Sequence, residues 1–229
     1  HDQSSAASDV YKRQAMDYAF FDRAKYLGDP DFFNVPQELL ISKQYAKDIS
    51  VKIKNKEELQ KIKITVSESE ETTHFSIVDK WGNAVSNTYT LNTAYGSGIV
   101  PTGTGILMNN EMDDFSSKPG YPNVYGLIGS EANKIEPKKT PLSSMTPVIV
   151  FKEDKPFLVT GSPGGSTIIT AVLQELLNVL DFNMSLSESS KKSKIHFQHL
   201  PDIVFYEKLD DETLKSLKTK KRMLQRKLG

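Results

Sequence analysis

The chain contains no cysteine among its 229 residues. Disulfide bonds, thiolate metal ligands and a cysteine nucleophile are therefore excluded. Its 4 histidines show no clustered spacing, since His196 and His199 lie three residues apart without an evident third ligand nearby. We therefore expect neither a metal site nor a cofactor.

Long apolar runs are also missing, and so is an excess of charge of one sign. No run approaches the roughly 20 residues of a membrane-spanning helix, and no secretory signal is visible. Lys+Arg and Asp+Glu are both 29, giving a formal net charge of +0. This balance argues against a nucleic-acid-binding surface over the whole protein. Hydrophobic residues make up 38%, which allows a real core.

The first third of the chain divides by composition. Residues 1–14 are small, polar and aperiodic, and we interpret them as non-native and leave them out of the fold prediction. Helical spacing of apolar residues follows over 15–28, ended by glycine and proline, and again over 35–49. Residues 50–71 are polar and charged, which is typical of a linker. The best domain boundary lies at the end of that linker.

Beyond the linker, the apolar period changes to two, which indicates strands. Strand pairs are expected over 73–78 with 84–91 and over 146–151 with 156–160, and a single short strand over 106–108. Residues 113–144 are interpreted as a long loop region. Strands followed by helices, without regular alternation, favour an α+β fold.

Two helices are expected in the last third of the chain. Seven apolar residues form one face of an amphipathic helix from 168 to 180, and Ser166 is well placed to cap it. A shorter helix near 185–193 opens with a capping box, Ser185 and Glu188.

Thr72 stands where the acidic linker meets the first strand. A mid-chain threonine is a poor nucleophile because its hydroxyl has no base beside it. Cleavage of the Glu71–Thr72 bond would give Thr72 a free α-amine, whose reference pKa of about 7.7–8.0 suits a general base near neutral pH. Alone, the pair Thr72-Thr73 is more simply explained as the start of a strand.

Gly164 and Gly165 precede the long helix. Glycines let the backbone approach a ligand, and a helix N-terminus offers amide N–H groups to an oxyanion. An ordinary tight turn explains them equally well.

A third feature is a polar set that suits recognition of a charged substrate. Its carboxylates and hydroxyls could bind an ammonium group, although each residue is also compatible with an ordinary loop. The members are Asn92, Glu111, Asp113, Asp114, Ser143 and Ser144.

These features occur within a series of multi-residue motifs. TTHFSIVDKWGNAVSNTYTLN, GSGIV, NNEMDDFSSKPG, PNVYGL, PLSSMTP and VTGSPGG follow one another from residue 72 to 181. In this order and spacing they resemble the small subunit of gamma-glutamyltransferases (glutathione hydrolases). The stretch RAKYLGDPDFFNVP, residues 23–36, is similar to the end of that family's large subunit.

The resemblance implies an N-terminal-nucleophile hydrolase fold, an α-β-β-α sandwich that is incomplete in this chain. It also implies a precursor that cuts itself before Thr72. Residues 15–71 would then be the end of the large subunit with its linker, and residues 72–229 a small, catalytic subunit shortened at its C-terminus. The partners implied are the large subunit of the same precursor, glutathione and other γ-glutamyl compounds, and amino acids, peptides or water as acceptors.

Site roles follow motif by motif from the same resemblance. Thr72 would be the nucleophile and, through its freed amine, the base, with Thr90 orienting it. Asn92, Glu111 and Asp114 would bind the substrate α-amino group, Ser143 and Ser144 its α-carboxylate, and the amides of Gly164 and Gly165 would form the oxyanion hole.

The sequence also departs from the family pattern. Most of the large subunit is missing, including the arginine that pairs with the substrate carboxylate, so we predict little or no activity for this chain alone. A cephalosporin (glutaryl) acylase of the same superfamily and a non-catalytic fragment are the alternatives. Family members are commonly periplasmic or secreted, and we expect the same here.

Overall fold

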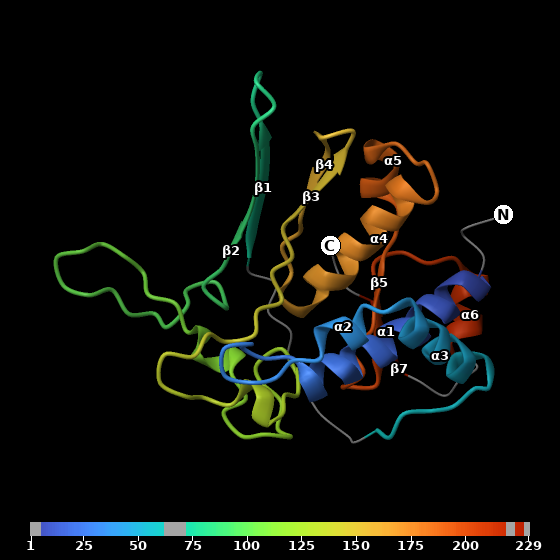
Figure 1. Cartoon of the computed structure of the whole chain (residues 1–229), viewed down its shortest axis with the longest axis horizontal. Coiled ribbons are helices and arrows are strands. Elements are labelled where there is room, and N and C mark those ends of the chain that lie inside the picture. The colour runs from blue at the N-terminus through green and yellow to red at the C-terminus, as the bar shows by residue number, and fades with distance from the viewer. Residues whose placement is uncertain (1–5, 62–71, 219–222, 227–229) are drawn as a thin grey trace.

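The computed structural model describes residues 6–61, 72–218 and 223–226, and Figure 1 shows their arrangement. The helices are α1 (Ala6–Tyr26), α2 (Gln37–Leu40), α3 (Lys43–Lys54), α4 (Ile168–Leu180), α5 (Leu186–Lys191) and α6 (Asp211–Lys218). The strands are β1 (Thr73–Val78), β2 (Ala84–Tyr89), β3 (Val148–Lys152), β4 (Lys155–Thr160), β5 (Ile195–His196), β6 (Ile203–Tyr206) and β7 (Met223–Arg226), with short 3-10 turns η1 (Glu111–Asp114), η2 (Glu131–Asn133) and η3 (Gly165–Thr167). Helices around three small sheets confirm the α+β prediction.

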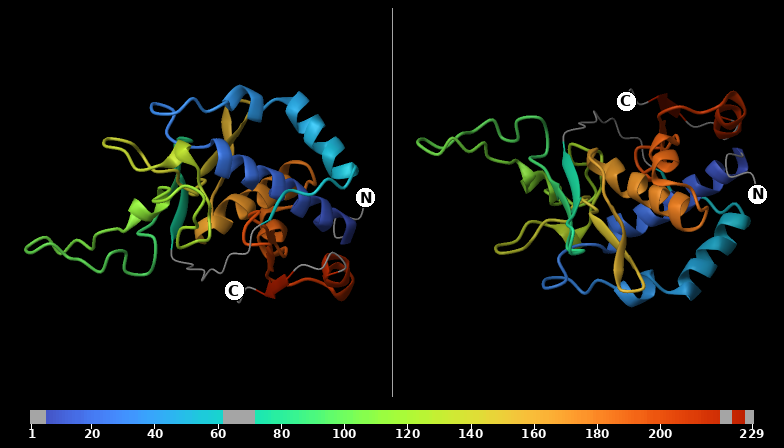
Figure 2. Two further views of the ribbon diagram at one scale, coloured as in Figure 1. Left: turned by 90° about the horizontal axis from the view of Figure 1, so that it is seen from below. Right: turned by 90° about the horizontal axis from the view of Figure 1, so that it is seen from above.

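Both predicted hairpins are present. β1 pairs antiparallel with β2, and β3 with β4. The second hairpin turns at Glu153 and Asp154, whose φ angles of 52° and 58° are those of a tight hairpin turn. The hairpins lie side by side, since Ser86 Oγ on β2 donates to the Thr160 carbonyl at the end of β4 over 2.8 Å (Figure 1). The expected short strand at 106–108 is wrong. These residues have no strand structure and Ile106 is 61% exposed. The segment between β2 and η1 forms a loop, green in Figure 2, that projects from the molecule.

The main core lies between α1, α6 and the sheet β5-β6-β7, in which β6 pairs antiparallel with β5 and parallel with β7. Its buried residues are Met16, Ile195, Phe197, Val204 and Leu217. α1 begins at Ala6 rather than at residue 15, and Arg13 is only 4% exposed. Leaving residues 6–14 out of the fold prediction was therefore wrong. Their polar composition gave no sign that Arg13 is buried against the core.

α4 is present where predicted, but its packing differs from the prediction. The buried residues of this helix are Ile168, Val172 and three polar ones, Thr170, Gln174 and Asn178. Gln174 exchanges hydrogen bonds with the backbone of Ile195 at 2.8 and 3.2 Å, so the polar side of α4 faces β5. On the apolar face, Leu173 and Leu180 are each 44% exposed.

Helix ends follow the local sequence only in part. Ser185 and Glu188 form the predicted capping box of α5. Ser166 does not cap α4; it is buried in η3 and donates to Gln198 Oε1 at 2.6 Å. The helix expected over 35–49 is divided into α2 and α3, which reaches Lys54 and so extends into the predicted linker.

Candidate active site

The two threonines of the candidate site face each other at the open end of the first hairpin. The register Thr73↔Tyr89 places Thr72, just before β1, opposite Thr90, just after β2. Thr72 Oγ1 donates to Thr90 Oγ1 over 3.2 Å, and the Asn92 N–H donates to the same Thr90 oxygen over 3.1 Å. Thr90 Oγ1 therefore accepts hydrogen bonds from both the Thr72 hydroxyl and the Asn92 N–H. Glu71, on the other side of the predicted cleavage bond, lies outside the described residues.

Asn92 connects the threonine pair to the acidic turn η1. It is 3% exposed and has a positive φ of 55°. Its Nδ2 donates to Asp114 Oδ1 over 2.6 Å, and its Oδ1 accepts from the Tyr125 hydroxyl over 3.1 Å. Burial, together with the nearby charges of Asp114 and Glu111, raises the pKa of Tyr125 to about 12, so this phenol remains a donor.

The carboxylates of η1 are tuned by burial and by each other. Burial raises the pKa of Asp114 above its ordinary value, although the Asn92 hydrogen bond and the charge of Arg23 oppose that shift. Burial and the charge of Asp114 raise the pKa of Glu111 as well. A cation bound beside these two carboxylates would favour their ionised forms, so this turn is suited to bind a cationic group.

Ser143 and Ser144 approach the same place from the strand-free segment before β3. Arg23, from α1, donates through a terminal guanidinium nitrogen to Ser144 Oγ over 3.1 Å. Because that oxygen accepts from Arg23, the hydroxyl proton of Ser144 can point to a ligand. Burial lowers the pKa of Arg23 to about 10, while the charge of Asp114 raises it, so the guanidinium is protonated at neutral pH.

Gly164 and Gly165 form the turn that leads from β4 through η3 into α4. Their φ angles are 124° and 55°, which favour glycine. A Cβ on Gly164 would also lie 2.6 Å from Thr167 Oγ1. The turn therefore requires glycine at position 164, both for its positive φ angle and because a side chain there would collide with Thr167.

One small pocket collects most of these groups. Its lining residues are Thr72, Thr90, Asn92, Asp114, Tyr125, Ser143, Ser144, Met145, Gly165 and Ile168. Seven of the predicted site residues thus meet, while Glu111 and Gly164 do not line the pocket itself. Glu111 acts on the pocket through its charge, which contributes to the raised pKa of Tyr125.

Arg23 and Tyr125 are site residues that the sequence did not identify. Both lie within quoted motifs, RAKYLGDPDFFNVP and PNVYGL, but no pattern in those motifs indicates a role. Arg23 contacts a serine 121 positions away. A single contact over that separation leaves no periodic signal in one sequence.

Among the described residues, no group of three or more His, Asp or Glu side chains is arranged to hold a metal ion. No helix in the described part of the chain is long and apolar enough to cross a membrane.

Sequence comparison identifies one family. A statistical description of the gamma-glutamyltranspeptidase family matches residues 3–228. The chain is 52% identical over 213 residues to the glutathione hydrolase proenzyme of Escherichia coli, covering 90% of this chain and 37% of that protein. The glutathione hydrolase proenzyme of Bacillus subtilis is 35% identical over 223 residues, covering 89% of this chain and 36% of that protein. The chain thus spans little more than a third of the length of these curated relatives.

The fold is similar to that of a solved gamma-glutamyltranspeptidase and to that of a solved cephalosporin acylase. The T380A mutant of the Helicobacter pylori gamma-glutamyltranspeptidase shares 53% identity and a TM-score of 0.64, covering 68% of this chain and 84% of that one. A cephalosporin acylase from Bacillus halodurans has a TM-score of 0.78 over 99% of this chain and 39% of its own, at 24% identity. That second likeness concerns the fold alone.

Proposed function

The chain belongs to the gamma-glutamyltranspeptidase family, and from this we propose that it carries the nucleophile and glutamyl-binding half of a glutathione hydrolase. In this proposal the Glu71–Thr72 bond is cut in a precursor, and Thr72 then transfers the γ-glutamyl group of glutathione or related amides. Several relatives bear the name proenzyme, which supports a cut precursor.

The observation that carries the proposal is the Thr72–Thr90 hydrogen bond of 3.2 Å inside a pocket shared with Asp114 and Ser144. In the uncut chain the Thr72 nitrogen is an amide and cannot act as a base. After cleavage it becomes an amine that accepts the Thr72 hydroxyl proton as Oγ1 attacks the γ-carbonyl carbon.

The acyl transfer proceeds in two steps. First, the tetrahedral intermediate collapses, the amine of cysteinylglycine leaves with a proton, and a γ-glutamyl ester of Thr72 remains. Second, water or the amine of an amino acid or peptide attacks this ester and restores the threonine hydroxyl. The N–H of Gly165, on the pocket wall before α4, would stabilise the oxyanion in both steps, together with that of Gly164.

Substrate selection would depend on the two charges of the glutamyl head. Asp114, held by Asn92, would bind the α-ammonium group. The Ser144 hydroxyl, oriented by Arg23, would donate to the α-carboxylate together with Ser143. Recognition through the glutamyl head alone would leave the leaving group loosely held, which would allow a broad range of acceptors.

The test is an assay of p-nitroaniline release from γ-glutamyl-p-nitroanilide by the protein that the complete gene encodes. We expect release that depends on Thr72, so that the Thr72→Ala variant is inactive. The 229-residue chain alone is expected to release little or none. Release by the Thr72→Ala protein at the wild-type rate would refute the assignment.

A glutaryl acylase is the second candidate, favoured only by the likeness of fold. Glutaryl substrates lack the α-ammonium group, so the buried Asp114 would have no cation to bind. We expect γ-glutamyl-p-nitroanilide to be preferred over glutaryl-p-nitroanilide, and Asp114→Asn to reduce that preference. A periplasmic or secreted location and a heterodimer with the large subunit are proposed on the family resemblance.

A further inference from the structure

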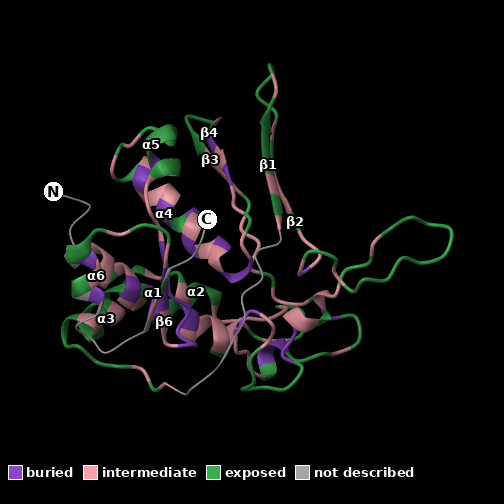
Figure 3. Ribbon diagram, turned by 180° about the vertical axis from the view of Figure 1, so that it is seen from behind, coloured by how far each residue is buried: buried purple, intermediate pink, exposed green. Residues whose placement is uncertain are grey.

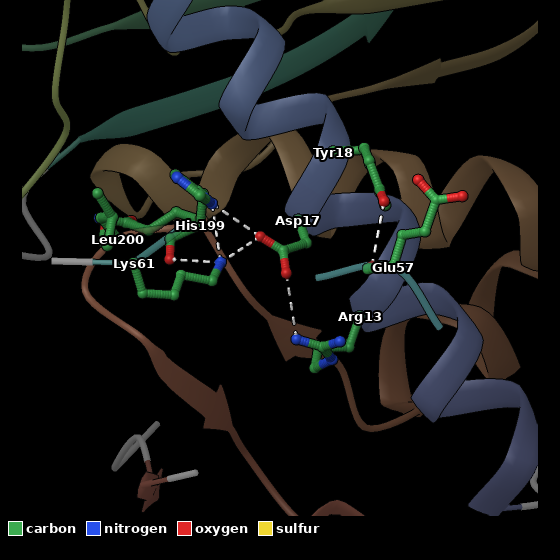
Figure 4. Close-up of polar contacts among 8 residues, drawn as sticks. Arg13, Asp17, Tyr18, Glu57, Lys61, His199 and Leu200 are labelled. Carbon is green, nitrogen blue, oxygen red and sulfur yellow. Dashed lines mark hydrogen bonds and ion pairs between the residues drawn. The ribbon is translucent and has the colours of Figure 1, made fainter. Parts of the chain in front are cut away.

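A buried polar cluster joins α1 to Lys61 and His199 (Figure 4), and none of its members lines the pocket described above. Asp17 Oδ1 is bonded to His199 Nδ1 at 2.8 Å and to Lys61 Nζ, and Asp17 Oδ2 accepts from Arg13 at 3.4 Å. Lys61 Nζ also donates to the His199 carbonyl over 3.1 Å. We call Arg13, Asp17, Lys61 and His199 the Asp17 cluster.

The Asp17 carboxylate is the acceptor of the cluster. It accepts from Lys61 and Arg13 and lies in hydrogen-bond contact with His199 Nδ1, which is also 2.8 Å from Lys61 Nζ. Burial raises the pKa of Asp17, but the hydrogen bonds from His199 and Lys61 and the charges of Lys61 and Arg13 lower it below the ordinary value. Asp17 is therefore ionised at neutral pH and joins all three partners.

The aromatic surroundings bind the same cations. The Phe197 ring is fully buried, and its centroid lies 4.9 Å from both Lys61 Nζ and Arg13 Cζ. The side chains of Asp17 and His199 are each 7% exposed, and that of Lys61 is 18% exposed. Removal of one partner from a pair this buried leaves an uncompensated charge in the core, so it should cost more than the same change in a surface ion pair.

The members come from both sides of the proposed cut. Arg13, Asp17 and Lys61 lie upstream of Thr72, whereas His199 and Phe197 lie downstream. Lys61 is also the last described residue before Thr72 and precedes Glu71 by ten positions. A second contact holds the same segment to α1, since the Tyr18 hydroxyl donates to the Glu57 carbonyl over 3.2 Å (Figure 4).

We propose that the Asp17 cluster is a tether: through Lys61 it keeps the C-terminal end of the upstream piece bound to the downstream piece after Glu71–Thr72 is cut. The inference rests on the proposed function, which supplies the cut. Chain termini are poorly ordered unless they are tied down. Lys61, ten residues before the proposed cut site, binds a carboxylate of α1 and a carbonyl of the downstream piece at once.

The experiment makes the cut without relying on self-cleavage. A recognition sequence for a site-specific protease is inserted before Thr72 of the 229-residue chain, and the purified chain is cut by that protease. The dissociation constant of the two pieces is measured by analytical ultracentrifugation, in the urea concentration that half-dissociates the wild-type pieces at micromolar concentration. Circular dichroism of each uncut variant checks its folding.

Lys61→Met is expected to raise the dissociation constant about tenfold, as loss of a charge-assisted hydrogen bond should. Lys61→Arg, which keeps the charge, is expected to recover part of that loss. The matched control is Lys47→Met, an exposed lysine on α3 of the same piece, which should leave the constant unchanged. If Lys61→Met does not fold uncut, Lys61→Gln takes its place.

Asp17→Asn tests the same connection from α1. Combined with Lys61→Met, it should raise the dissociation constant by less than the product of the two single effects, because Asp17 and Lys61 contact each other and the same downstream residue, His199. Equal constants for Lys61→Met and Lys47→Met, or effects of Asp17 and Lys61 that simply multiply, would overturn the tether. Failure of the proposed function would look different, namely no spontaneous cut before Thr72 in the unmodified protein.

Discussion

Apolar side chains are buried in one region of this molecule and exposed in another. Around α1, α6 and β5-β6-β7, residues such as Phe197 and Val204 are at most 1% exposed. In the hairpins that carry the candidate site, Ile77, Val85 and Phe151 are 50–61% exposed, and Figure 3 shows this contrast across the fold. A strand with one apolar face needs a covering layer. Among the described residues, the core region has its covering layer, whereas the hairpins of the site region have none over these side chains.

This difference fits the coverage of the relatives. The chain spans 37% of the Escherichia coli protein, so most of that relative's residues have no counterpart here. We propose that, in a precursor as long as that relative, further residues cover the exposed faces of the hairpins and the apolar face of α4, with Leu173 and Leu180. The polar site is nevertheless formed without them.

The largest expected effect separates the two regions by stability. Phe197→Ala should lower the free energy of unfolding by about 3–5 kcal/mol, because it leaves a cavity in the core. Phe75→Ala, on β1 where the side chain is 42% exposed, should cost less than about 1 kcal/mol. Urea unfolding measures both. Equal losses would show that the hairpin is packed as tightly as the core.

A smaller loss is expected where the site region is tightly packed. Gly161, in the segment after β4, lies against the imidazole of His74 on β1, and a Cβ on Gly161 would collide with that ring. Gly161→Ala should therefore destabilise the chain by about 1–3 kcal/mol, as overpacking does. Removing the ring at the same time, as in Gly161→Ala with His74→Ala, should restore part of the loss. A single variant as stable as the wild type would contradict this packing.

Arg23 connects the upstream helix to the site and should matter for binding. Arg23→Gln in the complete protein should raise the KM for γ-glutamyl-p-nitroanilide about tenfold, because Ser144 loses its charged donor. The kcat should change much less, since Thr72 and Thr90 are untouched. Lys12→Gln, near the start of the same helix, is the control. A fall in kcat with KM unchanged would place Arg23 in the chemical step.

The weakest effect expected is a shift in pH dependence. Because burial raises the pKa of Asp114, its carboxylate is protonated at a higher pH than an ordinary aspartate. Ammonium binding needs the ionised form, so KM should increase as the pH falls through this raised pKa. Arg23 opposes the shift, so Arg23→Gln should move the rise in KM to still higher pH. A KM profile that follows an ordinary aspartate pKa would contradict the assignment.

Local patterns predicted the hairpins, α4 and the capping box of α5 because each depends on neighbouring residues. The motif resemblance placed Thr72 beside Thr90 and Asn92 beside Asp114. It could not reveal Arg23, or the burial of Arg13 within a segment interpreted as non-native, because both contacts depend on distant parts of the chain. The polar packing of α4 was missed for another reason. Its apolar face predicts burial, but Gln174 instead satisfies backbone groups of Ile195.

The central claim is that Thr72 becomes an N-terminal nucleophile. Mass spectrometry of the complete protein after incubation tests it most directly, with the Thr72→Ala variant alongside. We predict a new N-terminus at Thr72 in the wild type and an intact chain in the variant. An uncut wild-type protein, or a cut at the same bond in both, would contradict it.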